Sequence, residues 1–377
     1  MINKYCILGS FLIYLPLMVI GGVFYEDRLV VLDVSINTIM FFLSVMLVYI
    51  SYYPRYFIFR SKMTLCLSGV IIIIPILILS SNANFQGMEK YLNSLFLGLL
   101  GYLIVINAIN YSLKEYILKL SILFILVLFV AAVIWKLKYG FWLRHINYFM
   151  NGPIVFGRNM AVGFFLTAIF LPFGKKINII LLLIFFFGVL WSMSKGPIIA
   201  LAASSLYFLY QKNKPSFLLL VVSIFISMLF LLYTSIDLSD TPLHRIQIGF
   251  QALLGISNSS SAAGSVGIRS EMIADTIMII NGNLILGIGA GNWQSVLNYP
   301  FTYPHNIFIE VFSDLGIIFG AILLLPYIGF LVRPTNKIFV LPLFFLISHQ
   351  VSGDISDARW LLLFSLLSFG VNKKYFE

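Results

Sequence analysis

The feature that most constrains this chain is a series of long apolar runs separated by short polar segments. A run of roughly 17–25 apolar residues can cross the hydrocarbon core of a bilayer as a helix. Twelve runs of about this kind are found, at 6–24, 29–53, 63–80, 91–112, 116–135, 154–173, 177–193, 197–213, 216–236, 303–332, 338–353 and 358–371. The chain therefore has the pattern of a protein that crosses a membrane many times.

Composition agrees with this pattern. Hydrophobic residues make up 60% of the chain and charged residues 10%, with a mean hydropathy of +1.00, whereas soluble domains have about 45–50% apolar and about 25% charged residues. We predict an all-α polytopic membrane protein of about twelve transmembrane helices, forming a single integral membrane domain over 1–377. Cys6 and Cys66 lie in or beside apolar runs, which favours small apolar residues over a metal site or a disulfide.

The basic residues orient the predicted bundle. With both termini in the cytoplasm, the inside segments hold 14 of the 24 basic and two of the 14 acidic residues, a balance of +12 against −2 for the rest. The positive-inside rule supports this topology. The charge is spread over short loops without interleaved aromatic residues, so the bilayer, and not a nucleic acid, is the predicted partner.

One long segment, 237–302, interrupts the short loops and is placed outside by this topology. Within it, 241–256 has the apolar periodicity of an amphipathic helix lying on the membrane surface. Residues 257–267 (SNSSSAAGSVG) favour a flexible connector, and 268–280 (IRSEMIADTIMII) resume helical periodicity. The prediction is a large periplasmic loop that contains short amphipathic helices.

The loop ends in a glycine-rich turn, GNLILGIGAGNW. Gly287, Gly289 and Gly291 are spaced like the start of a dinucleotide-binding motif, but no βαβ unit surrounds them. Close packing of the backbone is the preferred interpretation.

Several basic residues fall on the outer side, against the topology bias: Arg144, Arg158, Lys195, Arg245, Arg269 and Arg359. Guanidinium groups bind phosphate oxygens through two parallel hydrogen bonds, and lysine binds them as a point charge, so an anionic ligand at the outer leaflet would explain them. The alternative is that each cation reaches lipid headgroups or pairs with a nearby acid. Arg158 and Lys195 stand out because they lie within or between apolar spans, where a charge is costly.

The stretch FTYPHNIFIEVFSDLGIIFG, residues 301–320, heads a long apolar run. If 303–332 is one continuous helix, it is about 45 Å long, and His305 stands at the outer interface. Glu310 and Asp314 then share a face that lies about 140° and 180° from His305. A neutral imidazole can take a proton from a hydroxyl near neutral pH. The alternative is a histidine that only hydrogen-bonds a loop carbonyl.

The segments GIGAGNW and YPHNIFIEVFSDLGIIFG strongly resemble the signature of the bacterial O-antigen ligase and polymerase superfamily, over about 45 residues. WSMSKGPIIAL is similar to the family helix with a Ser-Arg-Gly element. IRSEMIADTIMII is similar to the segment whose arginine closes the large periplasmic loop, and SGDISDARWLLL resembles the tail of many polymerase members.

The resemblance implies a GT-C-like helical bundle at the inner membrane that acts from its periplasmic face on undecaprenyl-pyrophosphate-linked oligosaccharides, with no cofactor and no metal. His305 takes the place of the family base, Arg269 that of the loop arginine, and Lys195 stands where most relatives have arginine. A chain-length regulator protein is a further implied partner. The residues expected to bind pyrophosphate or sugar are Arg158, Arg359, Asn306 and Arg245.

Three functions stay open at this point, and the SGD tail slightly favours the polymerase. The polymerase joins lipid-linked repeat units, whereas the ligase transfers the finished chain to a lipid A core by the same chemistry. A lipid-oligosaccharide flippase, which is not an enzyme of this kind, would also have about twelve spans, but internal repeats are expected there and none is found.

Overall fold

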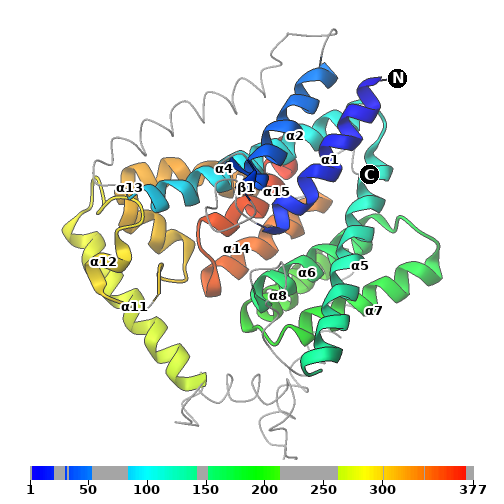
Figure 1. Ribbon diagram of the computed structural model, residues 1–377. Coiled ribbons are helices and arrows are strands. Elements are labelled where there is room, and N and C mark those ends of the chain that lie inside the picture. Colours follow the sequence, from blue (N-terminus) through cyan, green and yellow to red (C-terminus); the bar gives the residue numbers. More distant parts are fainter. Residues whose placement is uncertain are drawn as a thin grey trace, which may run out of the picture. The chain divides into compact units, whose positions relative to one another are not determined.

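The computed structural model describes residues 2–20, 30–31, 34–52, 84–141, 152–212, 262–299, 301–334 and 336–370 (Figure 1). These residues fall into two compact units. Unit 1 comprises 1–124, 275–342 and 353–377, and unit 2 comprises 125–274 and 343–352.

Unit 1 is helical apart from one pair of very short strands within its described residues. It contains α1 (Ile2–Ile20), α2 (Ile36–Tyr52), α4 (Phe85–Asn110), α12 (Trp293–Leu297), α13 (Ile307–Ile328), α15 (Arg359–Gly370) and the 3-10 helices η1 (Gly329–Val332), η2 (Lys337–Phe339) and η3 (Ser356–Ala358). The strands β1 (Val30–Val31) and β2 (Val34–Ser35) pair antiparallel, with Val31 opposite Val34.

Unit 2 contains α6 (Pro153–Phe170), α7 (Lys175–Trp191) and α8 (Lys195–Lys212). Three further helices contribute residues to both units: α5 (Lys114–Tyr139), α11 (Ala262–Gly282) and α14 (Val340–Ser352). The turn that separates α7 from α8, residues 192–194, lies close to the predicted division between the runs 177–193 and 197–213.

Four of the described helical stretches are long and apolar enough to cross a membrane: Gly87–Asn110, Lys114–Tyr139, Pro153–Phe170 and Ile307–Val332. Every predicted span that falls on described residues coincides with a helix. The spans predicted at 63–80 and 216–236 lie outside the described residues, so the number twelve stays a prediction. The chain is a multi-pass helical membrane protein.

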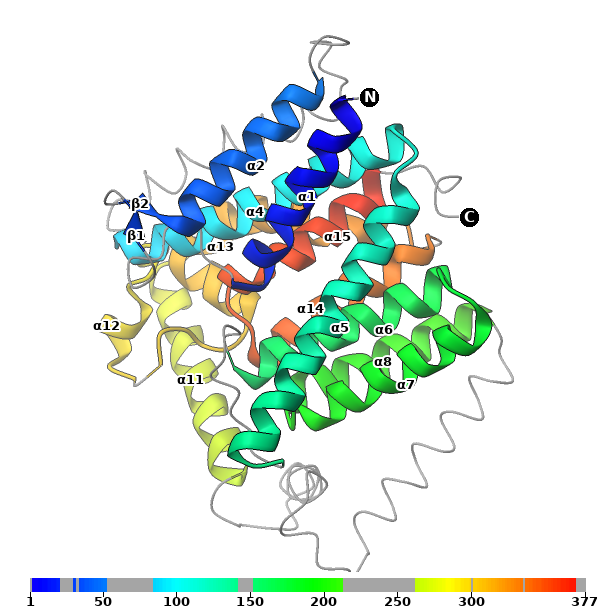
Figure 2. The same cartoon turned by 45° about the vertical axis from the view of Figure 1, so that its right-hand side comes forward.

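Small residues bring the helices of unit 1 close together. The hydroxyls of Ser10 in α1 and Ser44 in α2 are 2.7 Å apart, and these two helices lie side by side in both views (Figures 1 and 2). A methyl group on Gly98 of α4 would lie 2.7 Å from the Leu362 side chain of α15. Small residues at such contacts let apolar helices pack without a hydrophobic driving force between them.

Small residues also allow close helix contacts in unit 2, along α6. Pro153 begins this helix at a position where the missing N–H costs nothing. Gly163 faces the ring of Phe185 in α7, which a methyl group would approach to 3.0 Å. Gly157 faces Ser192, just after α7, and Pro197, in the first turn of α8. The glycine next to Arg158 therefore brings α6 against the α7–α8 turn and the start of α8.

Three sequence predictions are wrong in detail. Helix α2 begins at Ile36, because residues 30–31 and 34–35 of the predicted span 29–53 form strands. Helix α11 begins at Ala262, so 262–267 are helical where a flexible connector was predicted. The run 303–332 is not one continuous helix, because α13 begins at Ile307 and Gly316 within it has φ 73° and ψ 172°. The amphipathic helix predicted at 241–256 lies outside the described residues.

Candidate functional site

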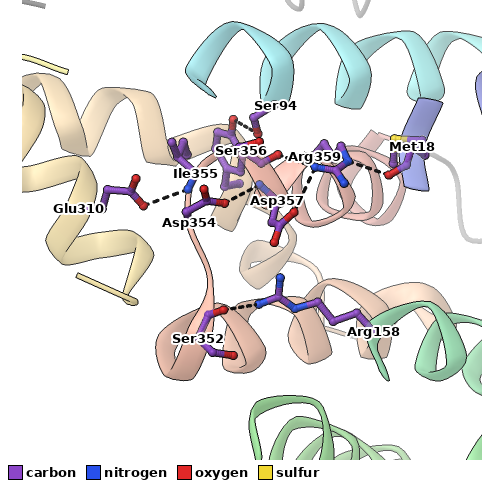
Figure 3. Close-up of polar contacts among 11 residues, drawn as sticks. Met18, Ser94, Arg158, Glu310, Ser352, Asp354, Ile355, Ser356, Asp357 and Arg359 are labelled. Carbon is purple, nitrogen blue, oxygen red and sulfur yellow. Dashed lines mark hydrogen bonds and ion pairs between the residues drawn. The ribbon is translucent and has the colours of Figure 1, made fainter. Parts of the chain in front are cut away.

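Arg158 lies on α6 and is buried within unit 2. Its Nε donates to the Oγ of Ser348 at 2.9 Å. Its Nη2 donates to the backbone carbonyl of Ser352 at 3.2 Å, the bond drawn in Figure 3. Both acceptors belong to the last two turns of α14. The guanidinium therefore sits against the C-terminal end of a helix, where the unpaired carbonyls carry partial negative charge.

Arg269 reaches the same helix end from α11. This side chain is half-buried, and its Nη1 donates to the carbonyl oxygen of Val351 at 3.2 Å. Arg158 and Arg269 thus bind the carbonyls of consecutive residues, although they are far apart in the sequence.

Lys195 is the first residue of α8 and is also half-buried. The next residue, Gly196, lies so close to α14 that an added methyl group would be 2.6 Å from the Oγ of Ser352. Arg158 and Arg269 are thus bonded to residues 348–352 of α14, and the start of α8, which carries Lys195, packs against the same residues. We call Arg158, Lys195 and Arg269 the cation cluster.

The cation cluster gives unit 2 a place where an anion could bind. Positive charge buried in a membrane protein is costly and is usually functional. The buried Oγ of Ser352 has no hydrogen-bond partner among the described residues, so a polar donor or acceptor is left at the same point.

The sequence analysis missed two groups that build this region. Ser348 and Ser352 were not singled out, because serines in an apolar run carry no distinctive signal. Lys136, near the end of α5, is fully buried. Its Nζ donates to the backbone carbonyl of Trp191 at 2.9 Å and lies 4.1 Å from the centre of the Trp191 indole ring. A lysine directly at the end of an apolar run is a signal that could have found it. The bond from Lys136 holds the end of α7, just before the turn that leads to Lys195.

His305 lies in unit 1, immediately before α13. Because the helix begins at Ile307, the histidine is in the preceding loop, with a left-handed φ of 61°. The rings of Phe301 and Tyr303 pack edge-on against it, with centroid distances of 5.3 and 4.6 Å. The angles predicted from His305 to the two carboxylates on a shared helix therefore do not apply.

Asn306 is the N-cap of α13. Its side-chain oxygen accepts hydrogen bonds from the backbone N–H groups of Phe308 at 3.0 Å and Ile309 at 3.2 Å, as a good N-cap does. This bonding explains why an asparagine follows the histidine. Its role towards a sugar stays a prediction.

The two carboxylates of α13 do share a face, as predicted, and both face α4. Glu310 lies 3.9 Å from the Nζ of Lys90 and accepts a hydrogen bond from the N–H of Ile355 at 3.0 Å (Figure 3). Asp314 accepts from the hydroxyl of Tyr91 at 3.0 Å. Both carboxylates are buried and held by neighbouring elements of unit 1, so their bonds tie α13 to the rest of the unit.

The glycine-rich turn packs directly on α13, which confirms the interpretation as close backbone packing. The N–H of Gly289 donates to the carbonyl of Asp314 at 2.9 Å, and that of Gly291 donates to the carboxylate of Asp314 at 3.3 Å. At Gly287, a side chain would overlap the backbone of Asp314. All three glycines have left-handed φ values, from 67° to 89°, which L-residues rarely adopt.

Arg359 is buried in unit 1 and is bonded to its own protein. Its Nε donates to the carbonyl of Met18 at 2.8 Å, and its Nη1 to the carbonyl of Ser356 at 2.9 Å and to the carboxylate of Asp357 at 3.3 Å (Figure 3). These bonds join α1 to the start of α15. They favour an architectural role over the predicted binding of substrate.

The predicted residues Arg144 and Arg245 lie outside the described residues. The structure therefore brings Arg158, Lys195 and Arg269 together in unit 2 and places His305, Asn306 and Arg359 in unit 1. Within the described ranges, no group of three or more His, Cys, Asp or Glu side chains has the arrangement of a metal site.

These features define a multi-pass membrane protein with buried cations at a helix end. A family model described as O-antigen ligase matches residues 180–325, which include Lys195, Arg269, the glycine-rich turn and His305. This match confirms the resemblance to the O-antigen ligase and polymerase superfamily, whose members are enzymes of the glycosyltransferase type. No curated protein matches the chain.

Proposed function

We propose that this chain is an O-antigen polymerase, a glycosyltransferase that works at the periplasmic face of the bacterial inner membrane. Its substrates would be oligosaccharide repeat units linked to undecaprenyl pyrophosphate. The observation that carries the proposal is the convergence of Arg158, Lys195 and Arg269 on the end of α14. The family match and the apolar helices support it.

In this proposal the cation cluster binds the pyrophosphate of the donor lipid. The bonds of Arg158 and Arg269 include ones to serine and peptide oxygens, and phosphate oxygens are stronger acceptors for a guanidinium than these. Breaking a sugar–pyrophosphate bond leaves negative charge on the lipid pyrophosphate. Fixed cations in a partly dry site would stabilise that charge in the transition state, without a metal ion.

His305 is proposed as the general base. The oxygen of an acceptor hydroxyl would form a bond to the anomeric carbon of the donor sugar while the bond from that carbon to pyrophosphate breaks. The hydroxyl proton would pass to His305, and the lipid pyrophosphate would leave as an anion. A half-buried imidazole in a loop, flanked by aromatic rings, suits this role.

The family match fits a ligase as well as a polymerase. We favour the polymerase because the segment SGDISDARWLLL is similar to the tail of many polymerase members. A ligase would transfer the chain to a lipid A core instead of to a second lipid-linked unit. The donor and the cation cluster would serve both reactions in the same way.

The deciding experiment uses the purified full chain in proteoliposomes with defined lipid-linked repeat units. A ladder of longer lipid-linked products from these units alone supports the polymerase. Product that forms only when lipid A core is added identifies a ligase, and movement of substrate across the bilayer without any new glycosidic bond identifies a flippase.

Variants of Lys195 connect the same assay to the cation cluster. Lys195→Ala should lose most of the product, whereas Lys195→Arg should be tolerated because arginine keeps the charge. Lys176→Ala removes an exposed lysine at the start of α7 and serves as the matched control. Normal ladders from Lys195→Ala at unchanged protein levels would remove Lys195 from the site.

A further inference from the structure

The turn between α11 and α12, residues 283–292, exposes three large apolar side chains in a row. Leu284, Ile285 and Leu286 are all exposed, and Ile285 is 63% accessible. Three adjacent aliphatic side chains facing outward are unusual for a loop in water. This turn forms part of the segment that the topology places outside the membrane, so the exposure calls for a physical explanation.

Backbone hydrogen bonds fix this turn to the interruption in α13. The N–H of Ile317 donates to the carbonyl of Leu284 at 2.9 Å, and the N–H of Ile288 donates to the carbonyl of Ser313 at 2.8 Å. Gly316 lies between these two bonds, and a methyl group there would overlap the backbone of Ile285. The turn therefore supplies partners to backbone groups that an unbroken helix would satisfy by itself.

The interruption lies well inside a candidate membrane span. The span runs from Ile307 to Val332, and the rise from Ile307 to Leu315 is about 12 Å along the helix axis. Since the hydrocarbon core of a bilayer is about 30 Å thick, the interruption lies deep in the membrane relative to the N-terminal end of α13. The turn bonded to it must lie at the same depth.

The outer face of α13 at this level is apolar. Ile317, Ile318, Ile322 and Leu325 are exposed large aliphatic side chains, and the last three are spaced for one helix face. Such a face on a spanning helix contacts lipid. Because Ile317 is bonded to Leu284, the exposed side chains of the turn continue this surface.

Lipid requires the polar groups of irregular backbone to find partners within the protein, and in this turn the groups that follow the apolar tip do so. The N–H groups of Gly287, Ile288 and Gly289 donate to the carbonyls of Asn283, Ser313 and Asp314 at 2.8–3.0 Å. The N–H of Gly291 donates to the carboxylate of Asp314, and that of Asn292 to the carbonyl of Gly289.

We propose that residues 283–292 form a re-entrant segment whose apolar tip, Leu284–Leu286, is inserted into the hydrocarbon of the bilayer. The partner of this surface is the acyl-chain region of the membrane. The segment predicted as one periplasmic loop is then anchored in the membrane at its C-terminal part, between α11 and His305. This inference concerns the turn and α13 alone and does not depend on the proposed reaction.

Site-directed spin labelling in nanodiscs tests the insertion. Cys6 and Cys66 are first replaced by serine, and single cysteines are then placed at Ile285 or Leu286, whose side chains already point outward. Collision rates with oxygen, which concentrates in hydrocarbon, are compared with those of a polar nickel chelate, which stays in water. We expect both labels to favour oxygen, with a ratio of the two rates close to that of a label at Leu325 on α13.

Labels at Gln294 and Thr302, which are exposed polar positions nearby in the sequence, serve as controls and should favour the nickel chelate. The proposal is overturned if Ile285 and Leu286 give the ratio found at Thr302. Size-exclusion profiles that match those of the cysteine-free parent show that each labelled protein is folded. A label at Ile285 that gives the Thr302 ratio in folded protein would place the turn in water.

Discussion

The segment 287–316 and the end of α14 differ in what their polar groups do. In 287–316, the most recognisable part of the sequence, Asp314 and the glycines bond to one another, and Asn306 caps its own helix. At the end of α14, the cations Arg158 and Arg269 come from separate helices to a few neutral oxygens. The family motif thus builds mostly architecture, whereas side chains scattered along the sequence build the proposed binding site.

Within 287–316, His305 is the residue to which we assign a catalytic role, that of general base. Its replacement should therefore lower the transfer rate more than any other substitution that we propose. His305→Gln keeps hydrogen-bonding capacity but cannot act as a base at neutral pH, so transfer should slow by roughly 10²–10⁴-fold. Product ladders from reconstituted protein measure this effect, with the exposed neighbour changed in Thr302→Ala as the control. A glutamine variant within about threefold of wild type would show that the histidine only holds the loop.

Arg158 and Arg359 are both buried arginines, and they should respond differently to the same substitution. Arg158→Lys loses the guanidinium fork, and transfer per folded protein should fall by about 10²-fold, as when a donor to a developing charge is removed. Arg359→Lys should mainly lower stability, on the order of 1–3 kcal/mol for each charged hydrogen bond lost. Its activity per folded protein should stay within about threefold of wild type.

Size-exclusion chromatography gives the amount of folded protein for both arginine variants, and the ladder assay gives their rates. If Arg359→Lys loses as much activity per folded molecule as Arg158→Lys, the architectural role of Arg359 is wrong. Its predicted contact with substrate would then be favoured.

Asp314 should give the smallest effect, because its carboxylate bonds to Tyr91 and Gly291 within unit 1. Asp314→Asn keeps an acceptor oxygen and loses the charge-assisted part of these bonds, so the rate per folded protein should change by less than about threefold. Thermal unfolding should show a modest loss of stability. A loss in rate as large as that of His305→Gln would mean that this carboxylate takes part in the chemistry.

The helical architecture could be predicted largely from the sequence, because apolar runs of spanning length leave few alternatives to helices. The glycine-rich turn could be predicted as close packing, since no βαβ unit accompanied it. The cations Arg158, Lys195 and Arg269 could be singled out because each opposes the topology bias or interrupts an apolar run.

Other features depend on tertiary contacts and could not be read in the sequence. At the interruption of α13 near Gly316, backbone groups of the helix form their hydrogen bonds with the turn at 284–289. The sequence of neither segment alone predicts that the two segments bond to each other. Arg359, like Arg158, was predicted to bind substrate as a basic residue on the outer side, and its bonds to Met18 and Asp357 indicate a different role. Ser348 and Ser352 became relevant only when α14 was seen to end beside the cation cluster.

The most direct test of the proposed cation cluster is the binding of a polyprenyl pyrophosphate, without any acceptor, to the full chain in nanodiscs. Dissociation constants would be compared for wild type, Arg158→Lys, Arg269→Lys and His305→Gln. The two arginine variants should bind at least about tenfold more weakly, the equivalent of about 1.4 kcal/mol, and His305→Gln should bind within about threefold of wild type. Unchanged affinity in both arginine variants, with folded protein in each sample, would contradict pyrophosphate binding at the end of α14.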